Sequence, residues 1–155
     1  MSLTQTFQAL ERLETAMAGY YERLAELHAA DAQASRLFAR LAIEEHGHAR
    51  EVALQRRLTT QVSQPNLDAV VELPEILRVL EEVGIAAGAI QKLPLEKAIA
   101  LAAAFELSAA EAHLRGVLGK VDAGVSHLLT GLGRGDNDHH SRLVAFAVSR
   151  GMPVK

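Results

Sequence analysis

The chain of 155 residues contains no cysteine, no tryptophan, two tyrosines and four phenylalanines. Without cysteine it has no disulfide, no thiolate metal site and no cysteine nucleophile, so nothing indicates an oxidising compartment and a cytoplasmic location is expected. Aromatic residues make up 4% of the chain and hydrophobic residues 49%. The core should therefore be aliphatic, and the length fits a single domain over residues 1–155.

Long apolar runs and a basic stripe are also absent. The most apolar stretch, residues 98–105, ends at Glu106, well short of the ~18 apolar residues that a membrane helix needs. The first residues, MSLTQTF, show neither the basic nor the apolar part of a secretory signal. The 16 Lys and Arg residues are interspersed with 19 Asp and Glu, giving a formal net charge of -3. We therefore expect neither a membrane nor a nucleic acid as a partner.

Proline is scarce, and the long segments between the four prolines show helical spacing of apolar residues without strand-like alternation. The pattern predicts an all-α fold with long helices at about residues 4–29, 32–60, 94–121 and 125–150. Residues 61–93 start with a polar stretch and should form a long crossover, with a short helix from Pro74 through Glu82. Two helical hairpins joined by a crossover between helices 2 and 3 make an antiparallel four-helix bundle.

Acids and histidines interrupt the apolar seams of all four long helices. In each half, a lone glutamate on one helix is matched by an acid on the next helix that is followed three positions later by histidine, which puts both side chains on one helix face. A shift of 91 or 92 residues superposes the two sets, so the halves repeat each other. The seam residues are Glu14, Glu45, His48, Glu106, Asp136 and His139.

A carboxylate in an apolar seam is costly unless it is paired, hydrogen-bonded or bound to a metal. Four of them would meet at about the same height in the bundle, with no seam-facing Lys or Arg nearby to neutralise them. Two divalent cations would cancel four carboxylates. Carboxylates and imidazoles suit iron or manganese, and zinc is an alternative without redox chemistry.

Two segments, LETAMAGYYERLAE and LFARLAIEEHGHA, resemble the first two helices of the rubrerythrin-like branch of the ferritin-like diiron-carboxylate family. The resemblance covers the four long helices and leaves the crossover unmatched. It implies a ferritin-like bundle with two Fe ions and makes the six seam residues their ligands. It also implies that Tyr21 lies beside the ligands, and that His113, at the equivalent position of the second half, lies beside them or is an added ligand.

The function that the resemblance implies is a reaction of the metals with dioxygen or peroxide, as in a rubrerythrin-like oxidoreductase, a ferroxidase or an iron-handling protein. The chain departs from the family in having Asp136 in place of Glu and Ala109 where rubrerythrins have an extra Glu. It also has no cysteine for the rubredoxin module, so electrons would have to come from an external donor. Ferritin-like domains commonly pair, which makes a homodimer the expected assembly.

Other interpretations remain open at this point. Gly131, Gly133 and Gly135 each cost about 1 kcal/mol inside a helix, so the last helix could break there and leave Asp136 or Asn137 as an N-cap, unless the glycines permit close helix approach. Glu44, His46 and His140 flank the seams and are typical of a solvated face or of neighbours of the ligands. The whole chain could also be a non-catalytic module for oligomerisation or partner binding, with an empty or structural site.

Overall fold

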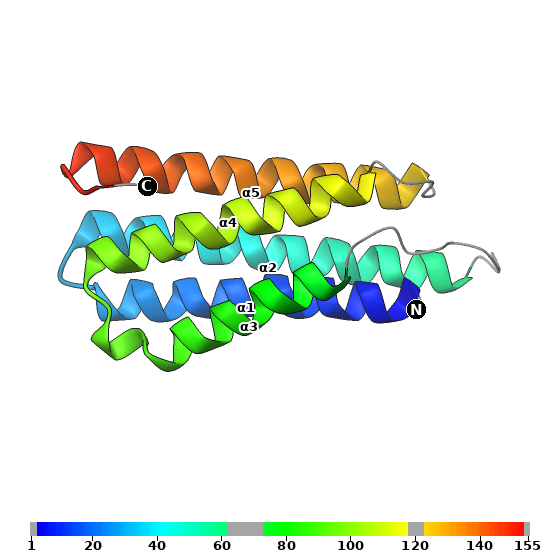
Figure 1. Cartoon of the computed structure of the whole chain (residues 1–155), viewed down its shortest axis with the longest axis horizontal. Coiled ribbons are helices and arrows are strands. Elements are labelled where there is room, and N and C mark those ends of the chain that lie inside the picture. Colours follow the sequence, from blue (N-terminus) through cyan, green and yellow to red (C-terminus); the bar gives the residue numbers. More distant parts are fainter. Residues whose placement is uncertain (1–2, 62–72, 118–122, 154–155) are drawn as a thin grey trace.

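The computed structural model describes residues 3–61, 73–117 and 123–153, and these residues form helices and no strand (Figure 1). The predicted all-α fold is thus confirmed. The α-helices are α1 (Leu3–Leu27), α2 (Ala32–Gln61), α3 (Leu73–Gly88), α4 (Leu95–Val117) and α5 (Ala123–Ser149), with a 3-10 turn, η1, at Ile90–Lys92. None of the helices in the described ranges has the length and apolar character needed to cross a membrane.

The four long helices form two antiparallel hairpins that lie side by side (Figure 1). In one hairpin α1 packs along α2, and in the other α4 packs along α5. Helix α3 packs on α1 and α4, so the segment between the hairpins contains a helix as predicted. The two hairpins also contact each other between α2 and α5, which run in opposite directions (Figure 1).

The observed boundaries differ from the predicted ones mainly in the crossover. The predicted short helix ends at Glu82, whereas α3 continues to Gly88, because Val83 and Ala86 extend the buried face that Ile76 and Val79 begin. The last residues of the predicted third helix, 118–121, lie outside the described residues. For α3, the apolar pattern thus located the helix but underestimated its length.

The turn between α1 and α2 depends on Asp31. Its Oδ1 accepts hydrogen bonds from the backbone N–H groups of Gln33 at 3.2 Å and Ala34 at 3.1 Å, which caps α2. Arg150 donates to both Asp31 oxygens at 2.9 Å and so joins this turn to the end of α5. Helix α1 ends at Leu27, two residues before the predicted end, and Asp31 lies in the connection that follows.

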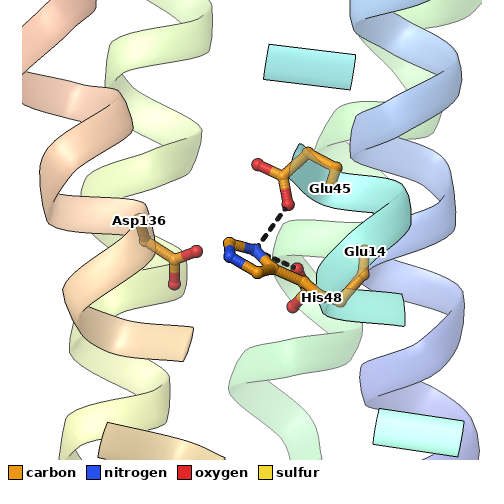
Figure 2. Close-up of side chains that lie close together, drawn as sticks. All are labelled: Glu14, Glu45, His48 and Asp136. Carbon is orange, nitrogen blue, oxygen red and sulfur yellow. Dashed lines mark hydrogen bonds and ion pairs between the residues drawn. The ribbon is translucent and has the colours of Figure 1, made fainter. Parts of the chain in front are cut away.

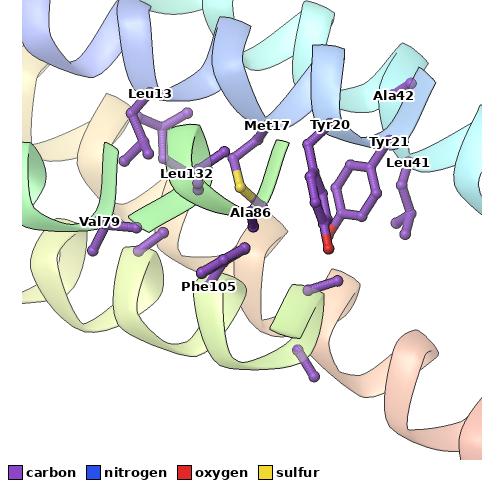
Figure 3. Close-up of a cluster of buried hydrophobic side chains, with 14 of the residues drawn as sticks. Leu13, Met17, Tyr20, Tyr21, Leu41, Ala42, Val79, Ala86, Phe105 and Leu132 are labelled. Atoms are coloured by element: carbon purple, nitrogen blue, oxygen red, sulfur yellow. The ribbon is translucent and has the colours of Figure 1, made fainter. Parts of the chain in front are cut away.

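The core is aliphatic with a small aromatic cluster, as the composition predicts (Figure 3). Tyr20 packs edge-on against Phe105 of α4, with ring centroids 5.7 Å apart, and Tyr21 stacks on Phe38 of α2. Among the described residues seven polar or charged side chains are buried. Thr6 is one, and the other six are all predicted site residues: Glu14, Glu45, Glu106, His113, Asp136 and His139. The apolar core is therefore interrupted at the predicted site.

Candidate metal centre

Helix α5 is continuous from Ala123 to Ser149 and carries its glycines without a break. Asp136 lies inside the helix, so the N-cap interpretation is wrong. Two of the glycines permit close approach between side chains and the α5 backbone: a Cβ on Gly133 would lie 2.6 Å from Leu114 Cγ, and one on Gly135 would lie 2.6 Å from Cε1 and Nε2 of His48. A Cβ on Gly131 would meet nothing within 4 Å.

The fold brings all six predicted ligands together from four helices. Their donor atoms form two groups, in each of which the atoms lie within 4.8 Å of one another. The His48 group consists of Glu14, Glu45, His48 and Asp136, and the His139 group consists of Glu45, Glu106 and His139. In the His48 group, the imidazole lies between the acids of α1 and α2, and Asp136 points toward it from α5 (Figure 2). Glu45 belongs to both groups, which is the arrangement that a carboxylate between two cations requires.

Glu45 is held between two imidazoles. Its Oε1 lies 2.6 Å from Nδ1 of His139 and its Oε2 lies 3.0 Å from Nδ1 of His48. The two rings stack with centroids 5.3 Å apart. Burial opposes charge on all three groups, but these hydrogen bonds outweigh it: the pKa of Glu45 falls far below its ordinary value, while the neighbouring acids raise the pKa of His48 to about 11 and that of His139 to about 10. Without metal, a carboxylate therefore lies between two imidazolium ions.

The other three acids have the opposite character. Burial, followed by the negative charge of Glu45, raises the pKa of Glu106 to about 8 and that of Asp136 well above its ordinary value. For Glu14, burial raises the pKa to about 8 against the hydrogen bond from His48. These carboxyl groups are mostly protonated at neutral pH in the metal-free protein. A bound cation would replace their protons, since it stabilises the ionised form.

Tyr21 and His113 lie beside the acids, where the sequence places them. The Tyr21 hydroxyl donates to Oε1 of Glu106, and burial together with the charge of that acid raises the tyrosine pKa well above its ordinary value, so it stays a donor. His113 has Nδ1 2.6 Å from Oδ2 of Asp136 and Nε2 3.4 Å from Oε1 of Glu14. Burial lowers the pKa of His113, so the ring is neutral, bonded to Asp136 of α5 and close to Glu14 of α1.

Two buried atoms in this layer have no hydrogen-bond partner among the described residues: Oε1 of Glu14 and Nε2 of His113. A buried polar atom left unpaired costs roughly 1–3 kcal/mol. A cation bound to Glu14 would satisfy the first of these atoms directly. The donor set of carboxylate oxygens and imidazole nitrogens also matches what iron, manganese or zinc takes in proteins. The residues therefore fit a metal centre.

Sequence reasoning gave Glu44 no definite role, and the structure places it against His139. Its Oε2 lies 3.0 Å from Nε2 of His139, and it is paired with Arg142 of α5 and, at 3.1 Å, with Arg40. Partial burial acts to raise the pKa of Glu44, but hydrogen bonds from these arginines lower it to about 2. Glu44 thus holds the outer nitrogen of His139 and leaves Nδ1 directed at the acids. The only sequence signal was the arginine three positions after His139.

The other two flanking residues lie outside the cluster. His46 pairs with Glu22 at 2.7 Å on the surface. His140 has Nδ1 2.8 Å from the carbonyl oxygen of Ala103, a contact between α5 and α4. Neither residue belongs to the two donor groups.

The chain is therefore an all-helical bundle whose buried layer of glutamates, aspartate and histidines could hold metal ions. Comparison with models of known protein families, with curated proteins and with solved structures gave no match.

Proposed function

We propose that the protein is a dinuclear metal-carboxylate protein of the ferritin-like, rubrerythrin-like type, holding two iron ions that react with dioxygen or peroxide. The observation that carries this proposal is the layer itself: four buried acids and two histidines from four helices, with Glu45 common to both donor groups. Arg40 and Arg142 pair with Glu44 at the edge of the layer rather than with the four buried acids. Two divalent cations would supply the missing positive charge.

Bound iron would supply redox chemistry with a small oxidant, and the side chains would divide the remaining work. The six ligands would hold the ions, with Glu45 between them. Tyr21 keeps a hydroxyl proton at Glu106, and His113 holds Asp136 by a hydrogen bond. Since the chain has no cysteine, the electrons for repeated turnover would come from an external donor. Ferroxidase activity and peroxide reduction are the two activities that such a centre would support, in a bundle that pairs as a homodimer.

A second function has its own support. In the metal-free protein the charge of Glu45 is balanced by two imidazolium ions, and the other acids keep their protons. The layer can therefore exist without metal, and a non-catalytic bundle for oligomerisation or partner binding is the competing proposal. A zinc-loaded bundle is the redox-silent form of the first proposal.

Metal binding separates these functions. Protein prepared without metal is titrated with Fe(II) under anaerobic conditions and then exposed to air while near-ultraviolet absorbance of ferric iron is followed. Two bound equivalents and an iron-dependent absorbance are expected for the wild type and for Glu81→Gln, which changes an exposed acid on α3. Glu45→Gln should lose both, because it removes the shared carboxylate. Absence of bound metal and of iron-dependent absorbance in the wild type would refute the diiron proposal, and zinc retention without absorbance would leave the redox-silent form.

A further inference from the structure

Helices α2 and α5 run antiparallel and contact each other along a seam (Figure 1). Glu44 faces His139, and the next pair along the seam is His48 against Gly135. One helical turn beyond that pair, the two helices line a surface groove of about 240 Å³. The seam therefore passes the His139 group first, the His48 group next and the groove last.

The seam is closed at His139. Both ring nitrogens have carboxylate partners, Glu45 inside and Glu44 outside, and the side chain is 1% exposed. Arg142 covers this contact by pairing with Glu44 and, at 2.9 Å, with Asp138. A cation in the His139 group could leave on this side only if the ion pairs opened.

The seam is open at His48. Its side chain is 15% exposed, against 1–2% for each of the other five candidate ligands. The groove that follows is lined by Glu51, Leu54 and Gln55 of α2 and by Gly124, His127, Leu128 and Gly131 of α5. Glu51 is one turn after His48 on α2, and Gly131 is one turn before Gly135 on α5. The groove thus begins about one helical turn from His48 along α2 and from Gly135 along α5.

We infer that this groove is the route by which divalent cations and small oxidants reach the centre, so that an ion in the His48 group exchanges with solvent while an ion in the His139 group is enclosed. The inference rests on the proposed metal centre and adds a functional difference between its two positions. Glu51 and His127 would offer a carboxylate and an imidazole to a cation in transit. Gly131 would keep the groove open. A Cβ at this position would meet nothing within 4 Å, so close packing does not account for the glycine.

Release of cobalt tests the inference without relying on catalysis. Protein loaded with two equivalents of Co(II) is mixed with excess chelator, and the visible absorbance of bound cobalt is followed by stopped flow. The wild type should release the metal in a fast and a slow phase. Gly131→Leu should slow the fast phase by about tenfold, a barrier increase of about 1.4 kcal/mol, with the stoichiometry and the slow phase unchanged. Gly84→Leu is the matched control, because Gly84 is an exposed α3 glycine whose Cβ would also meet nothing within 4 Å.

Two further variants test the inference without placing a larger side chain in the groove. Glu44→Ala should speed the slow phase, because it removes the outer partner of His139. Glu51→Lys, a change at an exposed residue, should slow the fast phase by charge repulsion, and this slowing should diminish at high salt. A single release phase, or equal fast phases in the wild type, Gly131→Leu and Glu51→Lys, overturns the inference and leaves the proposed function intact. Failure of the wild type to bind two equivalents refutes the proposed function instead.

Discussion

Gly135 and Gly131 lie one helical turn apart on α5, and only Gly135 lies against a candidate metal ligand. An alanine Cβ at position 135 would be 2.6 Å from Cε1 and Nε2 of His48, whereas one at position 131 would have no neighbour within 4 Å. The pair Gly135→Ala and Gly131→Ala therefore makes the same chemical change with and without contact to the centre. We predict that Gly135→Ala weakens metal binding and that Gly131→Ala does not.

The magnitudes follow from two opposing effects. Both substitutions replace glycine inside a helix, which stabilises the folded protein by up to ~1 kcal/mol. At position 135 the His48 ring must also retreat by about 1 Å to restore an ordinary contact of 3.4–4 Å. A shift of that size changes the position of Nδ1 relative to Glu45 and Glu14, from which it lies at 3.0 and 3.4 Å. Even indirect disturbance of a ligand commonly reduces metal affinity by about 10–100-fold, so at least the lower end of that range is expected for the His48 group.

Isothermal titration with Mn(II) and thermal unfolding of the metal-free protein measure the two effects separately. Gly131→Ala should raise the melting temperature and keep both binding sites. Gly135→Ala should keep one site of nearly normal affinity, that of the His139 group, and weaken the other. Equal, undiminished affinities in the two variants would refute the placement of His48 against α5, and loss of both sites in Gly131→Ala would refute the use of that variant as a neutral change.

Three further outcomes follow from the electrostatics of the layer. Binding of two divalent cations at pH 7 should release about five protons, from three carboxylic acids and two imidazolium ions, measurable with an indicator in weak buffer; release of one proton or none would contradict the assigned charges. The metal-free protein should melt at lower temperature as the pH rises from 6 to 9, because the folded pKa values of Glu14 and Glu106 are about 8 against 4.5 when unfolded and those of His48 and His139 are about 11 and 10 against 6.5. The stabilisation present at low pH is lost through this window at ~1.4 kcal/mol per pH unit for each extra proton bound by the folded state. A melting temperature that rises from pH 6 to 9 would contradict this prediction. Glu44→Ala should weaken one of two Mn(II) sites by about 10–100-fold, with partial recovery in Glu44→Gln, whose carbonyl oxygen still accepts from His139; two unchanged sites would show that Glu44 does not support this ligand.

The helices and the buried layer could be predicted from the sequence because both depend on local periodicity. An acid and a histidine three positions apart share one helix face whatever else the chain does, as Glu45 and His48 illustrate. A polar residue in phase with an apolar seam is buried when that seam is, which is why five of the six candidate ligands are buried. The length of α3 was underestimated because the residues after Glu82 are rich in glycine and alanine, although Val83 and Ala86 continue the apolar spacing of Ile76 and Val79.

The arrangement around the ligands depends on distances between helices, which periodicity does not encode. Glu44 and Arg142 are 98 positions apart in the chain and meet only because α2 and α5 pack in one particular register. The same register puts Gly135 against His48 and leaves Gly131 beside an open groove, although the two glycines carry the same penalty in any sequence-based argument. The sequence by itself therefore determined which residues face the interior. Only the tertiary structure decided which of them meet and on which side solvent reaches them, because both depend on how the two hairpins are set against each other.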